Sequence, residues 1–150
     1  MRRSRHVAVD DCSRMAMVSV CPDQSGATAA QFLRQVVAEF ARQGVRIERV
    51  MTDRAFAYLR SNDFQHALGQ LGIRHLVTRP YRPQTNGKAE RFIQTLLAEW
   101  AYFRPYRHNI ERLRALPRWV RFYNHQRTHS ELRNQPPWAV FVNNVLGKYS

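Results

Sequence analysis

A helix followed at once by a strand occurs twice in this chain, each time with a glycine at the junction. Gly44 separates a helical pattern from the apolar run at residues 45–52, and Gly72 separates a second pattern from residues 73–78. Glycine readily adopts the left-handed conformation that ends a helix, and a short apolar run rich in β-branched residues favours a strand. The helical faces carry the apolar side chains of Phe32, Val36, Val37, Phe40, Phe64, Leu68 and Leu71. This alternation predicts an α/β domain with a mixed sheet flanked by helices.

An opening hairpin precedes these segments. Residues 6–9 and 15–21 are predicted to form its strands, joined by a turn that contains Asp10 and Asp11. A short acidic side chain in a turn accepts hydrogen bonds from nearby amides, so one aspartate is expected to cap an amide of the turn. The alternative is that one of the two aspartates serves as a metal ligand. Capping side chains are also expected before the two helices, namely Ser25 or Thr28 for the first and Ser61 for the second.

The chain reads as helical from Lys88 onward. Residues 101–150 contain nine arginines or lysines and only two acids. One helix is expected to start near Asn109 and to be bent or broken at Pro117, and the pair Pro136-Pro137 opens a short last helix. The pattern therefore predicts two parts, an α/β part at residues 1–104 and a basic helical region at residues 105–150.

The charge of the chain indicates a polyanionic partner. Lysines and arginines number 24 against 11 acids, which gives a formal net charge of +13 in 150 residues. Such a basic chain gains free energy when its cations displace the counterions of nucleic-acid phosphates. The sequence has no apolar run of signal-peptide or membrane-spanning character, so a cytoplasmic protein without membrane partners is expected. Cys12 and Cys21 lack zinc-ligand spacing and are expected to be ordinary reduced residues.

Asp53 and Glu90 are the candidate metal ligands. Asp53 follows the run at residues 45–52, and Glu90 opens the helix after the basic loop at residues 79–88. Carboxylates at a strand end and a helix start can converge on one divalent cation, and Mg²⁺ or Mn²⁺ prefers such hard oxygen ligands. The loop is expected either to reach DNA phosphates or to be a solvated connection. The expected DNA-binding residues are Arg79, Arg82, Gln84, Thr85, Asn86, Lys88 and Arg91.

Several motifs of the chain occur together in one known family. The longest runs from Arg79 to Phe92 and reads RPYRPQTNGKAERF, and it is preceded by the pair Thr52-Asp53. Residues 7–14 read VAVDDCSR, and residues 123–129 read YNHQRTH. Over nearly its whole length the chain thus resembles the integrase core of DDE transposases and retroviral integrases. The resemblance is closest to bacterial insertion-sequence transposases of the IS481 group and next to those of the IS3 group.

This resemblance implies a ribonuclease-H-like fold with three metal-binding carboxylates. Asp53 matches the second of these carboxylates and Glu90 the third. The first belongs to an opening strand one hairpin before residues 7–14, and residues 1–6 contain no acid. A first strand is therefore expected to be missing, and residues 1–104 are expected to be a partial catalytic core. The family reads Asp-Asn-Gly where this chain has Asp53-Arg54-Ala55, so strain is expected if that turn needs a positive φ.

The family resemblance implies DNA transposition or integration, with cleavage and transfer of DNA strands that depends on Mg²⁺ or Mn²⁺. The expected partners are insertion-element ends, target DNA and further copies of the chain. Only two of the three carboxylates are present, so a remnant that binds DNA non-specifically without catalysis is an alternative. A third possibility is a degenerate product that folds poorly, because a missing strand would expose a sheet edge.

Overall fold

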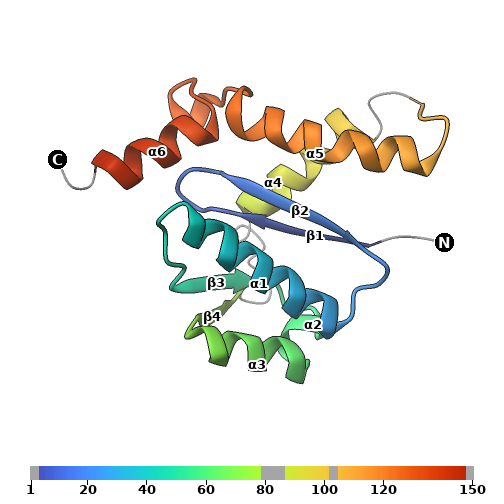
Figure 1. The fold of residues 1–150 in the computed structure, drawn as a ribbon, viewed down its shortest axis with the longest axis vertical. Coiled ribbons are helices and arrows are strands. Elements are labelled where there is room, and N and C mark those ends of the chain that lie inside the picture. The colour runs from blue at the N-terminus through green and yellow to red at the C-terminus, as the bar shows by residue number, and fades with distance from the viewer. Residues whose placement is uncertain (1–3, 79–86, 102–104, 148–150) are drawn as a thin grey trace. The chain divides into compact units, whose positions relative to one another are not determined.

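The computed structural model describes residues 4–78, 87–101 and 105–147 (Figure 1). The chain groups into two compact units, of which the first comprises residues 1–6 and 18–87 and the second residues 7–17 and 88–150. The division expected from the sequence, between residues 104 and 105, does not coincide with these units and stays a prediction about domains. No helix of the described residues is long and apolar enough to cross a membrane.

The strands form two separate pairs. β1 (Ser4–Val9) pairs with β2 (Ala16–Cys21) as the predicted hairpin, and β3 (Arg49–Thr52) pairs in parallel with β4 (Arg74–Val77). The α/β class is confirmed, although the strands described lie in two two-stranded sheets and not in one mixed sheet. β3 is shorter than the predicted strand, because only the last residues of the apolar run find partners on β4.

The described part of the first unit contains three helices, α1 (Gly26–Arg42), α2 (Phe56–Leu59) and α3 (Asn62–Leu71). A serine hydroxyl caps each of the two long helices, Ser25 for α1 and Ser61 for α3, by accepting a backbone amide hydrogen bond. A glycine follows each helix with a positive φ, 80° at Gly44 and 67° at Gly72. Both helix boundaries predicted from local residues are therefore confirmed, and α2 is an additional single turn.

The core of the first unit lies between α1 and α3, which pack together beside the β3–β4 pair (Figure 1). Its buried members are Ala29, Ala30, Leu33, Phe64, Ala67, Leu68 and Ile73. The two helices are in close contact at their starts. A Cβ atom added at Gly26 would lie 1.6 Å from the hydroxyl oxygen of Ser61, so this approach requires a glycine.

The second unit, in its described residues, is mainly helical apart from its part of the hairpin. It contains α4 (Gly87–Leu96), the π-helical turn η2 (Leu97–Ala101), α5 (Asn109–His125), the 3-10 turn η3 (Ser130–Leu132) and α6 (Pro137–Gly147). The helix predicted to be bent or broken at Pro117 is not broken there, since α5 continues through that residue, and a bend stays a prediction. Pro117 lies on the exposed side of the helix, where water can satisfy the carbonyl group that loses its amide partner.

Asn124 ties α5 to the hairpin inside the second unit. Its side-chain oxygen accepts a hydrogen bond from the amide of Ala16 at 2.9 Å, and its side-chain nitrogen donates to the carbonyl of Ala16 at 3.0 Å. Both residues are buried, so the asparagine satisfies two backbone groups that water does not reach. Beside it, the core contains the buried side chains of Phe92, Leu96, Trp100, Leu116 and Tyr123.

Candidate functional site

Asp53 directly follows β3 and has an exposed side chain. One carboxylate oxygen accepts a hydrogen bond from the amide of Ala55 at 2.9 Å, which fixes the direction of the side chain. The other oxygen has no hydrogen-bond partner among the described residues and is free to bind a cation. Ala55 would be strained only in a left-handed turn, but it is not among the non-glycine residues with a positive φ. The strain expected at this position is therefore absent.

A chain of hydrogen bonds lies behind Asp53. The Thr52 hydroxyl donates to the carbonyl of Asp53 at 2.8 Å and lies 2.7 Å from Nε2 of His75. Nδ1 of His75 lies 3.2 Å from the side-chain nitrogen of Gln65, which also donates to the carbonyl of Tyr58 at 2.6 Å. Side chains of β4 and α3 thus hold the end of β3 that carries the candidate ligand.

The surroundings of these hydrogen bonds favour neutral side chains. The ring of His75 packs edge-on against Phe64, with 5.6 Å between ring centroids, and burial lowers the pKa of His75. Burial raises the pKa of the Tyr58 hydroxyl, and the negative charge of Asp53 raises it further. A neutral histidine beside the strand end adds no positive charge near Asp53.

Glu90 lies in the first turn of α4, where the helix dipole favours an acidic side chain. Its carboxylate is exposed and has no hydrogen-bond or ion-pair partner among the described residues. The neighbouring Arg91 is also exposed. Glu90 and Arg91, the two predicted site residues of this turn, therefore both face solvent.

Arg91 also acts on a nearby acid. The pKa of Glu131 is lowered first by a hydrogen bond from its own backbone and further by a hydrogen bond from Ser130 and by the charge of Arg91.

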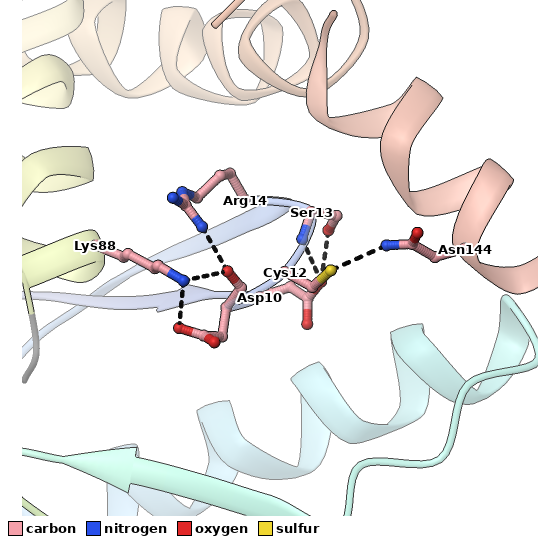
Figure 2. Close-up of polar contacts among 7 residues, drawn as sticks. Asp10, Cys12, Ser13, Arg14, Lys88 and Asn144 are labelled. Carbon is pink, nitrogen blue, oxygen red and sulfur yellow. Dashed lines mark hydrogen bonds and ion pairs between the residues drawn. The ribbon is translucent and has the colours of Figure 1, made fainter. Parts of the chain in front are cut away.

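Lys88 is held by the hairpin turn, as Figure 2 shows. Its ammonium group donates to the carbonyl of Asp11 at 2.8 Å and lies 2.8 Å from the Asp11 carboxylate. The Asp11 side chain is almost fully exposed, so water and salt compete with this ion pair. A phosphate that contacts Lys88 would compete with the Asp11 carboxylate for the ammonium group.

Asp10 has the turn role expected from the sequence. Its carboxylate accepts hydrogen bonds from the amide of Ser13 at 2.9 Å and from the hydroxyl of Ser13 at 2.6 Å. From α6, the side-chain nitrogen of Asn144 donates to the Cys12 sulfur at 3.1 Å (Figure 2). Asp10 is thus occupied by turn formation.

The predicted site residues are distributed over both units. Asp53 belongs to the first unit and Glu90 to the second. No group of three or more His, Cys, Asp or Glu side chains is placed to hold a metal ion within residues 4–78, 87–101 and 105–147. The metal-binding roles of Asp53 and Glu90 stay predictions. The predicted DNA-binding residues outside the described residues are Arg79, Arg82, Gln84, Thr85 and Asn86.

α5 presents three exposed arginines on one side. Arg114, Arg118 and Arg121 follow one another at i, i+4 and i+7, so they project from the same helical face. None of them has a hydrogen-bond or ion-pair partner among the described residues. The opposite face is buried through Leu116, Tyr123 and Asn124. We refer to these three residues as the α5 arginines. Their spacing is visible in the sequence, but only the burial of the opposite face shows that it points to solvent.

The histidines of the motif at residues 123–129 make packing contacts. His129 packs edge-on against Tyr123 with 5.0 Å between ring centroids, and His125 packs against Trp138 at 5.0 Å. Tyr123 in turn packs edge-on against Phe92 at 4.8 Å, and burial raises its pKa to about 12. Burial also lowers the pKa of His129. Tyr123 and Asn124 of this motif are therefore part of the core of the second unit, whereas His125, Gln126 and Thr128 are exposed.

Two family models match the chain, both described as integrase core domain. One covers residues 3–83 and the other residues 71–137, so the two overlap and together span most of the chain. No curated protein matches the chain in sequence.

Solved retroviral integrases share the fold. A chain in the simian T-cell lymphotropic virus intasome in complex with PP2A regulatory subunit B56 gamma is 26% identical, with a TM-score of 0.75. The match covers 92% of the present chain and 48% of that chain, so the present chain spans about half its length. The catalytic core domain of BIV integrase is 20% identical, with a TM-score of 0.73 and coverage of 99% and 91%. The HTLV-2 integrase catalytic core domain in complex with magnesium (trimeric form) is 19% identical, with a TM-score of 0.70 and coverage of 92% and 84%.

Proposed function

Because the chain belongs to the integrase core domain family, we propose that it acts on DNA in a transposition or integration reaction. The structural feature of this chain that supports the proposal is the set of α5 arginines. They span about 10 Å along the axis, since a helix rises about 1.5 Å per residue. An arginine that has no protein partner offers a planar, permanently charged group to a phosphate. We propose that they contact the phosphate backbone of duplex DNA.

Asp53 and Glu90 are the proposed metal ligands of the reaction. Both provide exposed carboxylate oxygens, and Mg²⁺ is often held by one or two carboxylates together with water and substrate phosphates. When bound there, Mg²⁺ or Mn²⁺ would polarise a phosphodiester and lower the pKa of a water molecule or hydroxyl group. The similar HTLV-2 domain in complex with magnesium supports this choice of cation.

Self-association is part of the proposal. The similar structures include an intasome and a trimeric form of a catalytic core domain. We expect copies of the present chain to assemble on DNA ends, with target DNA as the second substrate.

A nicking assay tests the catalytic role. The full chain is incubated with supercoiled and end-containing DNA in Mg²⁺ or Mn²⁺, beside the variants Asp53→Asn and Glu90→Gln. Each variant removes one negative charge, so nicking is expected to fall to the level without metal. Asp63→Asn, which neutralises an exposed acid of α3, is the matched control and is expected to retain activity. Equal nicking by all four proteins would refute the assignment.

A salt titration tests the DNA surface. The logarithm of the binding constant falls with the logarithm of the salt concentration by about 0.9 for each phosphate contacted. Replacing Arg114, Arg118 and Arg121 together by glutamine should therefore reduce this slope by about 2.7. The control replaces Arg46, Arg49 and Arg74, three exposed arginines of the first unit, and removes the same total charge. Equal slopes for the two triple variants would exclude a specific role for the α5 arginines.

A second candidate function is DNA binding without cleavage. The observation that favours it is that the described residues hold no group of three side chains placed for a metal ion. Salt-sensitive binding together with no metal-dependent nicking by the unmodified chain would support this function over the first.

A further inference from the structure

The hydrogen-bond chain behind Asp53 has only one consistent set of donors and acceptors. The side-chain nitrogen of Gln65 has two hydrogens, and one of them is donated to the carbonyl of Tyr58. The other points to Nδ1 of His75, so Nδ1 must accept and cannot carry a hydrogen. The contact with Gln65 therefore requires a neutral His75 ring that carries its hydrogen on Nε2.

The other end of the hydrogen-bond chain independently requires a hydrogen on Nε2 of His75. The Thr52 hydroxyl has one hydrogen, which it donates to the carbonyl of Asp53. Its oxygen can therefore only accept from Nε2 of His75, which lies 2.7 Å away. Nε2 must carry the ring hydrogen for this bond to form. Two separate constraints thus orient every bond from Gln65 to Asp53 in one direction.

This chain of hydrogen bonds fixes the backbone of Asp53, the candidate metal ligand. The Asp53 carbonyl is held by Thr52, and the Asp53 carboxylate is held by the amide of Ala55. The two bonds hold the peptide group after Asp53 and the side chain at the same time. Packing alone does not need the hydroxyl group of Thr52, because valine has the same branched shape.

We propose that His75 is a positioning residue for Asp53, acting by holding the Thr52 hydroxyl in the orientation that fixes the turn after β3. The proposal rests on the proposed function, in which Asp53 binds a divalent cation. Its content is that the cation affinity of Asp53 depends on a histidine that does not touch the cation. His75 is not part of the motifs that define the family resemblance.

The tautomer of His75 is tested first, in the unmodified chain. A long-range ¹H–¹⁵N spectrum at neutral pH distinguishes the two neutral tautomers and the charged ring. The expected result is a neutral ring protonated at Nε2. A ring protonated at Nδ1, or at both nitrogens, would overturn the proposal.

The effect on Asp53 is tested with a matched pair of variants. Thr52→Val keeps the shape and removes the hydroxyl group, whereas Thr52→Ser keeps the hydroxyl group. The readout is hydrogen exchange of the Ala55 amide, which is bonded to the Asp53 carboxylate. Exchange is expected to be about tenfold faster in Thr52→Val, the effect of one lost hydrogen bond, and nearly unchanged in Thr52→Ser. Equal exchange in the two variants would contradict the proposal.

His75→Phe tests the histidine itself. It keeps an aromatic ring against Phe64 and removes both ring nitrogens. Faster exchange of the Ala55 amide, similar to that in Thr52→Val, is expected. If this variant does not fold, the tautomer and the Thr52 pair still decide the question.

Binding of Mn²⁺ alone separates this proposal from the proposed function. Paramagnetic broadening of the Ala55 amide reports cation binding at Asp53 without DNA or catalysis. The Mn²⁺ concentration at half-broadening is expected to rise about tenfold in Thr52→Val and to stay similar in Thr52→Ser. If the unmodified chain shows no broadening, the metal role of Asp53 fails, and the positioning of Asp53 by His75 is judged by Ala55 exchange.

Discussion

Among single residues, Asn124 makes a contact with a large expected effect on stability. It is the only side chain that satisfies both the amide and the carbonyl of Ala16 among the described residues. A buried backbone group left without a partner costs about 1–3 kcal/mol, which exceeds the net gain from forming the same bond. The motif at residues 123–129 is thus explained by a backbone contact as well as by aromatic packing.

Asn124→Ala is expected to lower the free energy of unfolding by about 3 kcal/mol, because it leaves both groups of Ala16 unsatisfied. Urea unfolding followed by circular dichroism measures this change. Asn143→Ala on the exposed side of α6 is the control and should stay within about 0.5 kcal/mol of the unmodified chain. A similar loss in both variants would show that the Ala16 contact is not the cause.

Three histidines are expected to make the folded chain less stable at low pH. Burial lowers the pKa of His6, His75 and His129 below the ordinary value of 6.5. Below pH 6.5 the unfolded chain therefore binds protons more readily than the folded chain. The contribution of these neutral histidines to the free energy of unfolding should be fully present above pH 6.5. It should be lost as the pH falls through the pKa values of the folded chain. Urea titrations at pH 7, 6 and 5 check this, and His75→Gln should reduce the dependence. Constant stability over this range would refute the expectation.

Among the elements, α1 and α3 are in close contact where each helix starts. Gly26 of α1 leaves no space for a side chain next to Ser61, whose hydroxyl accepts the amide hydrogen bond of Phe64 at 3.2 Å. The same serine is therefore a cap and a packing surface. A change at Gly26 affects both roles at once.

Gly26→Ala is expected to destabilise the chain by about 2 kcal/mol, because the new methyl group overlaps Ser61 and displaces its capping hydroxyl. Gly69→Ala is the matched control. Nothing lies within 4 Å of a Cβ atom at Gly69, so alanine should stabilise α3 by about 0.5–1 kcal/mol through its higher helix propensity. Thermal unfolding should thus shift in opposite directions, and shifts of the same sign would contradict this account.

The sequence predicts those features of the elements that depend on neighbouring residues. The capping serines and the glycines that end α1 and α3 act within one helical turn, so they are predicted correctly. The length of β3 depends on its partner β4, which local patterns do not specify. The continuation of α5 through Pro117 depends on which side of the helix is buried.

The candidate site follows the same rule. The sequence identifies Asp53 and Glu90 through motifs, but it does not identify Thr52, His75 and Gln65 as a connected group. Their hydrogen bonds join residues 10 and 23 positions apart, and no sequence spacing predicts such contacts.

At the scale of the whole molecule, the net charge of +13 opposes folding at low ionic strength. Compact folding brings these positive charges together, and their repulsion extends over about 30 Å at 0.01 M salt but only about 8 Å at 0.15 M. Salt should therefore stabilise this chain even without DNA.

The melting temperature is expected to rise as sodium chloride increases from about 0.01 to 0.15 M, because screening weakens the repulsion. Differential scanning calorimetry measures it. Sucrose at matched osmolality is the control for effects that do not involve charge. A melting temperature that falls with salt would show that attractive ion pairs outweigh the net repulsion.

The contact between Asn124 and Ala16 also has a consequence for biosynthesis. The two residues are 108 positions apart, and a ribosome adds about 5–20 residues per second. Asn124 is therefore synthesised roughly 5–20 s after Ala16. During that interval the nascent hairpin has two open backbone groups that a chaperone or another nascent chain can reach.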